Sequence, residues 1–497
     1  MSEKFEQLEE ELKMLQNLEY IEDLLSWDKE VMMPEGGQKA RVHQQSTVSK
    51  LQRRIITGDK LDGLLKDIER SELNQRQEAL LREVEKDKRK AEAVPEELME
   101  RISETSSEGI EVWREAREEN DFESFAEILG EIVGLYREYA NHINPDSEPY
   151  KVLFKDYEPF LKFESMEEIM EEVKTNLVPL IEDIHDSNVD INKGFFEGGF
   201  DEETQKKLCK NIARDIGLPE SSNRVDVSTH PFTSGNTFDT RITTRYNAND
   251  LSESVLVTMH EGGHALYQQD LPEDEYNSPI GASRELGVHE SQSRLWENHV
   301  GRSKVFWKYM LPKLEENFSE SIGKDTLEAC YESINHVRED NTVRFNADEL
   351  TYHLHILIRF EIERKLINGE IEVEELPEIW NKKYEKYLGV TPDNHKEGVM
   401  QDIHWAGGNF GYFPTYTLGS VLSAQLFDAA ESEIDNLDQK IEEGNFEPLR
   451  DWLRENVHQH GKLYETEELV KKATGEKPTP EPFLDYVEEK YSELYNL

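Results

Sequence analysis

Two histidines stand four residues apart, at His260 and His264, and Glu261 lies between them in the pentapeptide His-Glu-Gly-Gly-His. Residues four apart on a helix project from one face, so both imidazoles can bind a single zinc ion. A glutamate in the second position can act as general base on water bound to that ion. The pattern therefore predicts a zinc site of the metallopeptidase type, with Glu261 as the base.

The residues around this motif indicate a helix that begins just before it. Asp250 and Glu253 predict a capping box ahead of an apolar run at 255–259. Gly262 and Gly263 fit a helix interior poorly, because each costs about 1 kcal/mol relative to alanine. We therefore expect another backbone, or a substrate, to pack so closely there that no side chain fits.

A catalytic zinc ion usually takes three protein ligands, so a third must be found. A second expected helix, over 287–298, follows a loop long enough for the chain to turn back. Glu290 on this helix is the favoured third ligand, and its neighbour His289 competes, because helical geometry alone does not choose between adjacent positions. Glu297 is expected either to face solvent or to lie behind the ligands.

Composition restricts the class of protein. Acidic residues outnumber basic ones 106 to 57, which leaves a formal net charge of −49. Such a surface argues against nucleic acid, which needs basic patches, and against anchoring to an anionic membrane. No apolar run approaches the length of a membrane span. The acidic faces are expected to be solvated, and adaptation to high salt is a second interpretation of them.

Cys209 and Cys330 are the only cysteines among the 497 residues. Two thiols so far apart do not form a disulfide framework, so we expect a reducing compartment. Residues 1–6 have neither a basic nor an apolar signal region and are typical of an amphipathic helix. The expected location is the cytoplasm.

The elements that must position the site are mostly helices. Segments 224–229 and 237–246 alternate β-branched and polar residues around a Gly-Asn turn, which predicts a short antiparallel pair next to the zinc helix. Its edge could receive an extended peptide. We expect one domain, 1–497, with a helical wall at 1–220 and the catalytic half at 221–497. Beyond a first helix around 8–25, expected helical runs in the wall are 38–57, 62–93, 95–120, 122–143, 166–187 and 201–216.

Other motifs carry polar side chains that could serve the same site. Taken singly, each has a plain structural explanation, such as arginines that pair with surplus acids. They are His-Pro-Phe at 230–232, Asp-Thr-Arg-Ile-Thr-Thr at 239–244, Val-Arg-Phe-Asn-Ala-Asp at 343–348, Gly-Val-Met-Gln-Asp-Ile-His-Trp at 398–405 and a Gly- and aromatic-rich stretch at 407–416.

Together with the zinc motif and His-Glu-Ser-Gln at 289–292, these motifs resemble the carboxypeptidase Taq family in order and spacing. An N-terminal signature at 27–37 extends the resemblance to essentially the whole chain. Gly262 is the one local departure, since bulkier residues are common there in the family; it lies between two ligands and removes neither.

The resemblance implies a helical, deeply clefted fold of the gluzincin, neurolysin-like type and a homodimer. It also implies metal-dependent release of single C-terminal amino acids from peptides with broad specificity. By the same mapping, the metal ligands are His260, His264 and Glu290, and Glu261 is the general base.

The remaining assignments also follow from the resemblance. Arg344 is the candidate for holding the terminal carboxylate of the substrate, with Arg241 as its rival. His404 and Tyr416 are candidates to stabilise the oxyanion, and His230 and Tyr412 to bind substrate.

Three points stay open at this stage. The donor set suits zinc, but cobalt and manganese share such ligands. An oligopeptidase of similar fold would cut internally and would need no clamp for a carboxylate. A non-catalytic peptide-binding protein would not need an intact base.

Overall fold

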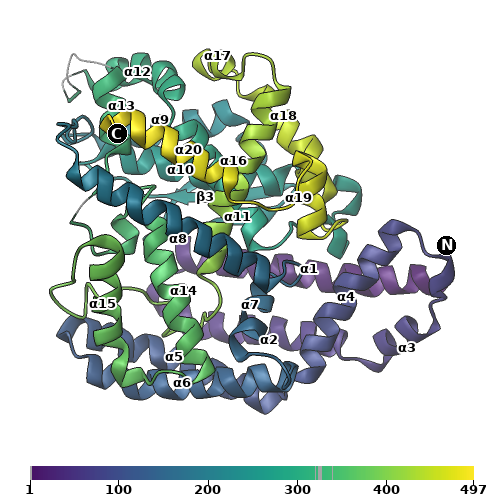
Figure 1. Cartoon of the computed structure of the whole chain (residues 1–497). Coiled ribbons are helices and arrows are strands. Elements are labelled where there is room, and N and C mark those ends of the chain that lie inside the picture. The colour runs from purple at the N-terminus through teal and green to yellow at the C-terminus, as the bar shows by residue number, and fades with distance from the viewer. Residues whose placement is uncertain (1–2, 320, 323–326, 339) are drawn as a thin grey trace.

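The computed structural model describes residues 3–319, 321–322, 327–338 and 340–497, and helices dominate it (Figure 1). Met1 and Ser2, part of the expected N-terminal helix, lie outside the described residues. The first part of the chain is helical throughout, as expected. Its helices are α1 (Glu3–Val31), α2 (Gln38–Ile56), α3 (Asp59–Asp67), α4 (Gln75–Ala93), α5 (Glu96–Glu119), α6 (Phe122–Ile143), α7 (Pro149–Tyr157), α8 (Phe163–Asp186) and α9 (Glu202–Ile216).

One long run expected to be a single helix, 62–93, is two. The chain is extended at Ile68, and α4 begins anew behind Asn74, whose side chain forms a capping box with Gln77. The cap supplies the local signal that ends one helix and starts the next. The periodicity of the apolar residues alone did not reveal the break between the two helices.

The second part of the chain carries the motif helices. A π-helical segment, η5 (Leu295–Gly301), continues α11 directly. The helices are α10 (Leu251–Gln269), α11 (Leu286–Arg294), α12 (Lys304–Phe318), α13 (Leu327–Asn335), α14 (Tyr352–Asn368), α15 (Leu376–Leu388), α16 (Pro414–Glu433), α17 (Leu437–Glu442), α18 (Glu447–Asn456), α19 (Thr466–Thr474) and α20 (Glu481–Tyr495).

A small sheet of order β1-β3-β2 lies against α10. It consists of β1 (Asn223–Val227), β2 (Thr233–Asn236) and β3 (Asp239–Thr244). The expected antiparallel pairing of the two longer segments is wrong, because β1 runs parallel to β3. The antiparallel partner of β3 is the short strand β2, joined to it by a tight turn. β2 forms an edge of the sheet and lies beside α1.

Two apolar clusters stabilise the molecule. The larger one joins side chains from Val94 to Tyr495, so the chain on both sides of position 220 contributes to one core. The smaller one packs α1, α3 and α4 together and takes in Ile280 from the second half. In Figure 1, α20 crosses beside α8, which brings the C-terminal helix onto the first half of the chain. Among the described residues, no helix has the length and apolar character needed to span a membrane.

Candidate active site

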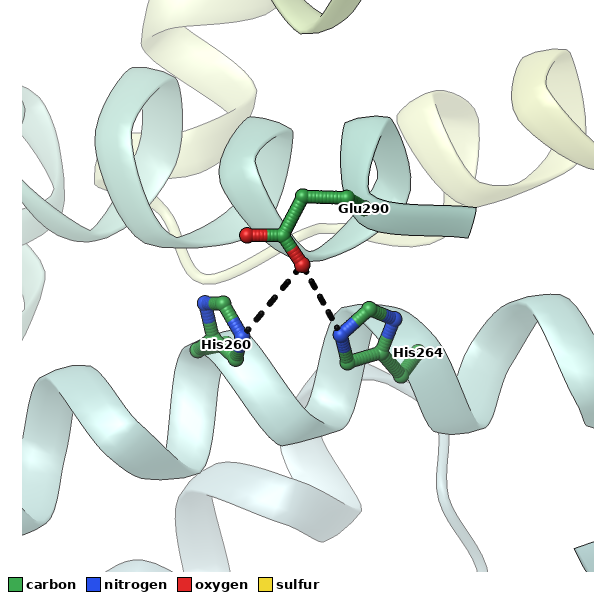
Figure 2. A group of neighbouring side chains, drawn as sticks. All are labelled: His260, His264 and Glu290. Atoms are coloured by element: carbon green, nitrogen blue, oxygen red, sulfur yellow. Dashed lines mark ion pairs between the residues drawn. The ribbon is translucent and has the colours of Figure 1, made fainter. Parts of the chain in front are cut away.

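Three ligand atoms converge between α10 and α11 (Figure 2). Glu290 Oε2 lies 3.3 Å from His264 Nε2 and 3.8 Å from His260 Nε2, and the three atoms all lie within 4.8 Å of one another. Ligands about 2.1 Å from a tetrahedral ion would be about 3.4 Å apart. The donor set and its spacing therefore fit a divalent metal with a coordination position left for water or substrate.

Two glycines allow the helices to approach closely enough to form this group. A Cβ on Gly263 would lie 2.3 Å from the carbonyl oxygen of Gln292 on α11. On the other side, a Cβ on Gly419 of α16 would lie 2.4 Å from Cγ of Glu290. The close approach expected at Gly263 is thus present, and the neighbour is backbone. At Gly262 the neighbour is only the end of the Ile216 side chain, at 2.6 Å.

The N-terminus of α10 is capped, but not by the expected box. The Asp250 side chain accepts a hydrogen bond from the backbone N–H of Ser252 at 2.9 Å. Glu253 turns instead to Arg245 at the end of β3, with which it forms an ion pair. The capping box is wrong because tertiary contact with the sheet offers Glu253 a charged partner. That contact joins the start of α10 to the sheet.

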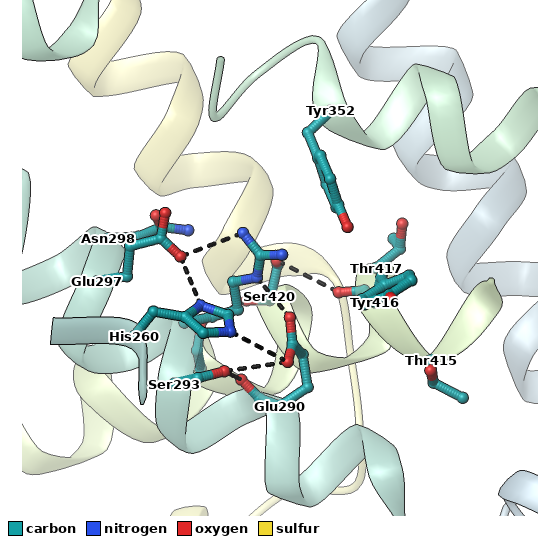
Figure 3. Close-up of polar contacts among 12 residues, drawn as sticks. His260, Glu290, Ser293, Glu297, Asn298, Tyr352, Thr415, Tyr416, Thr417 and Ser420 are labelled. Atoms are coloured by element: carbon teal, nitrogen blue, oxygen red, sulfur yellow. Dashed lines mark hydrogen bonds and ion pairs between the residues drawn. The ribbon is translucent and has the colours of Figure 1, made fainter. Parts of the chain in front are cut away.

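A second carboxylate stands behind His260 (Figure 3). Glu297 Oε2 lies 2.8 Å from His260 Nδ1, so an Nδ1–H donated to it leaves Nε2 free to face a metal. Glu297 lies on the π-helical segment and is 9% exposed, which confirms a place behind the ligands and excludes solvation. Its burial would raise the pKa, but Arg294, His260 and Arg302 hold the pKa of Glu297 down, at about 2.

Arg294 links the two carboxylates. Its Nε donates to Glu290 Oε1 at 2.7 Å and its Nη1 to Glu297 Oε2 at 3.3 Å. Against the effect of burial, Arg294 and His260 keep the pKa of Glu290 well below its usual value. Glu290 is therefore held as a carboxylate, with one oxygen on Arg294 and the other turned toward the histidines.

His289, the competing ligand, lies on the far side of His264. Its Nδ1 is 2.6 Å from His264 Nδ1, and its Nε2 is 3.0 Å from the Gln268 amide. It therefore contacts the ring nitrogen of His264 that faces away from Glu290. Hollows of about 340 and 310 Å³ lie on either side of Gln268, the first reaching His289 and the second bounded by α1 and the β2–β3 turn.

Glu261 is buried and turns toward the sheet edge. The hydroxyl of Thr233, on β2, donates to Glu261 Oε2 at 2.7 Å. The side chain thereby has a fixed direction beside the histidines that flank it in sequence. Thr233 was not a candidate from the sequence, because its place opposite Glu261 depends on the pairing of β2.

The aromatic candidates form one cluster. The Tyr412 ring lies 5.2 Å from that of Tyr416 and 5.6 Å from that of His404. Burial lowers the pKa of His404 to about 4 and raises the pKa of Tyr416 well above 10, so both are neutral near pH 7. His404 Nδ1 is buried and has no hydrogen-bond partner among the described residues. The cluster can therefore offer neutral hydrogen-bond donors.

Arg344 lies against the same cluster, with its guanidinium 5.5 Å from the Tyr416 ring. Its Nη2 donates to Asp402 Oδ1 at 2.7 Å, and its Nε donates to Oδ1 at 3.1 Å and to Oδ2 at 3.3 Å. Arg359 also binds Asp402, through Nε at 2.7 Å. Two guanidiniums share one carboxylate, which leaves about one positive charge for a ligand.

The two remaining candidates lie on the sheet side. Arg241 on β3 pairs with Asp239 at 2.6 Å and stacks over Trp27 of α1, 4.4 Å from the ring. His230, between β1 and β2, is exposed. The structure thus gathers Arg344, His404, Tyr412 and Tyr416 in one cluster and places Arg241 and His230 on the sheet.

The chain is similar in sequence and in fold to known metallopeptidases. A model of the carboxypeptidase Taq (M32) metallopeptidase family matches residues 7–491. The chain is 37% identical over 486 residues to thermostable carboxypeptidase 1 of Thermus thermophilus, with 95% of each protein covered. It is 37% identical over 476 residues to thermostable carboxypeptidase 1 of Pyrococcus furiosus, again with 95% of each covered. A crystal structure of an M32 carboxypeptidase from Deinococcus radiodurans R1 superposes with a TM-score of 0.96 at 34% identity, covering 99% of this chain and 100% of that one.

Proposed function

The chain belongs to the carboxypeptidase Taq (M32) metallopeptidase family and is a metal-dependent carboxypeptidase, and we propose that His260, His264 and Glu290 bind its metal. The observation that carries the proposal is the convergence of these three ligand atoms, and only these among the described residues, within 4.8 Å. Zinc suits two imidazoles and one carboxylate best, and cobalt or manganese could replace it.

A divalent ion in this group would supply a Lewis acid for the scissile carbonyl and for water. Glu261 is the general base: it takes a proton from the attacking water and passes it to the leaving amine. The hydroxyl of Thr233 holds Oε2 of Glu261, so the second carboxylate oxygen is the one left for the water. His404 and Tyr416, both neutral, donate hydrogen bonds to the oxyanion that forms.

Arg344 sets the register of cleavage by binding the C-terminal carboxylate of the peptide. It lies beside Tyr416. Arg344 and Arg359 together carry two positive charges, and the single negative charge of Asp402 neutralises only one of them. Guanidinium–carboxylate contacts are bidentate and directional, so the bond that is cut lies one residue from the bound charge. Tyr412 binds the peptide backbone, and Arg241 and His230 contact the peptide from the side of the sheet.

The specificity is broad, and the substrates are peptides with a free C-terminus. Two copies of the chain form a homodimer, which light scattering of the purified protein would test. The cytoplasm is the proposed location, because Cys209 and Cys330 are both buried and unpaired, as a reducing compartment would leave them.

The register is tested with a pair of peptides blocked at the N-terminus, one with a free C-terminal acid and one amidated. Mass spectrometry of the zinc-loaded protein should show stepwise loss of single residues from the free acid only. Internal cuts in both peptides would contradict a carboxylate clamp and indicate the action of an oligopeptidase.

A further inference from the structure

The side chain of Glu363, on α14, is completely buried and plays no part in the chemistry above. Three donors surround its carboxyl group. The indole N–H of Trp405 donates to Oε1 at 2.8 Å, while the backbone N–H of Gly411 and the hydroxyl of Tyr150 donate to Oε2, each at 3.1 Å. Burying a carboxyl group costs free energy, so a functional role would explain why this residue is buried.

Two of these donors belong to residues 404–412, the His404 loop. Trp405 directly follows His404, and Gly411 directly precedes Tyr412. One carboxyl group therefore binds both ends of the loop, next to a proposed oxyanion donor at one end and a proposed substrate contact at the other.

The loop also contains two glycines, each in a left-handed backbone conformation with close neighbours. Gly411 has a φ of +86°, and a Cβ there would lie 2.8 Å from the backbone nitrogen of Phe154. Gly408 has a φ of +76°, and a Cβ there would lie 2.3 Å from the Tyr136 ring. Both positions require glycine, which by itself makes a chain flexible, so an external contact must hold the ends.

We propose that Glu363 is the positioning residue of the active site: it fixes the His404 loop so that His404 and Tyr412 reach the reacting peptide bond. The inference rests on the proposed roles of these two side chains. Glu363 touches neither the substrate nor the metal, and acts only through Trp405 and Gly411.

The chemistry of the contact favours a carboxylate over an amide. All three neighbours are donors, and the two oxygens of a carboxylate accept from all of them without conflict. A glutamine would turn its NH₂ group toward either the indole N–H or the peptide N–H and lose that contact. Burial raises the pKa of Glu363 to about 7, against the hydrogen bonds from Gly411, Trp405 and Tyr150, so the buried charge costs stability.

The test compares Glu363→Gln with Glu361→Gln in the metal-loaded protein. Glu361 lies two residues away on the same helix and accepts from Lys383 and Tyr387, not from the loop. Glu363→Gln should lower kcat about tenfold and kcat/KM at least as much, and leave the bound metal unchanged. Glu361→Gln should leave kcat within twofold.

Trp405→Phe tests the same contact from the loop and remains informative if Glu363→Gln does not fold. Because both substitutions loosen the same loop, the double variant should lose less kcat than the product of the two single losses. Multiplying losses would overturn the proposal, as would full kcat in Glu363→Gln or a loss that Glu361→Gln reproduces.

His404→Gln, measured in parallel, separates this proposal from the function it rests on. Loss of kcat in His404→Gln together with wild-type kcat in Glu363→Gln would refute the positioning role alone. Wild-type kcat in His404→Gln would refute the proposed role of His404, and the inference with it.

Discussion

At the scale of single residues, the two candidate arginines have different neighbours. Arg241 stacks on Trp27 and pairs with the exposed Asp239, so its charge is already matched by a carboxylate of its own. Arg344 shares the carboxylate of Asp402 with Arg359 and lies against Tyr416. Only the second arrangement has positive charge to spare next to the neutral donors, which is why Arg344 is the proposed clamp.

Replacing Arg344 with glutamine should therefore reduce kcat/KM on a free-acid peptide about 100-fold, equivalent to roughly 2.7 kcal/mol, because a charged hydrogen bond to the substrate is lost. Asp402 keeps Arg359 as a partner, so no buried charge is left alone. Steady-state kinetics on acid and amidated peptides measure the effect. Arg241→Gln is the matched comparison, and a larger loss there than in Arg344→Gln would exchange the two roles.

At the scale of elements, local signals predicted more than long-range ones. The His-Glu-Gly-Gly-His spacing indicated α10 and the common face of His260 and His264, because residues four apart on one helix point in the same direction. The parallel direction of β1 relative to β3 could not be predicted, because β2 lies between them in the sequence and the direction depends on tertiary packing. Thr233 and Glu363 were missed for the same reason. Arg294 had a usable signal, the four-residue spacing from Glu290, which is typical of a helical ion pair.

The contact of α10 with α11 gives a second test, at Gly263. Gly263→Ala should destabilise the protein by roughly 1–3 kcal/mol and weaken metal binding, because α11 must move away with Glu290. Urea unfolding and competition with a chelator measure the two effects.

Gly262→Ala is the matched control on the same helix. Its new methyl group meets only the end of the flexible Ile216 side chain, and alanine removes a helix penalty of about 1 kcal/mol. We expect near-wild-type stability and metal affinity. Equal losses of stability and metal affinity in Gly262→Ala and Gly263→Ala would contradict a specific role for the close approach of α11 at Gly263.

At the scale of the whole molecule, the fold buries histidines in the neutral form. Burial lowers the pKa of His299 and of His404 to about 4 each and that of His353 to about 3. A histidine with a lowered pKa stabilises the fold fully above about pH 6.5, and this contribution is lost as the pH falls through its folded pKa. Buried carboxyls such as Glu363 act in the opposite sense, so one histidine must be isolated to see the effect.

His299 is suited to this, because it is buried and packs on the rings of Phe427 and Tyr486. His299→Gln should lower stability at pH 7.5 through lost packing. Relative to the variant, the wild type should then lose roughly 2 kcal/mol between pH 7.5 and pH 5. Urea unfolding of both proteins at the two pH values measures this change. If the difference in stability between the wild type and the variant is the same at both pH values, the pKa of His299 is not lowered in the folded protein.

The net charge of −49 also belongs to the whole molecule. Repulsion among so many carboxylates destabilises a compact state and is screened by salt. On the high-salt interpretation, the Tm should rise as NaCl is increased from about 0.1 to 1 M. Calorimetry measures the Tm. A Tm that is highest at low salt would reject adaptation to high salt and favour the interpretation of the acidic faces as an ordinary solvated surface.

The most direct test of the proposed mechanism replaces the carboxylate of Glu261, in the middle of the His-Glu-Gly-Gly-His motif, with an amide. Glu261→Gln keeps the shape of the side chain and its place beside Thr233 but removes the proposed base between His260 and His264. We expect one bound metal per chain, as in the wild type, and a kcat on a free-acid peptide lowered by at least about 1,000-fold. Wild-type turnover by a metal-loaded Glu261→Gln protein would contradict it.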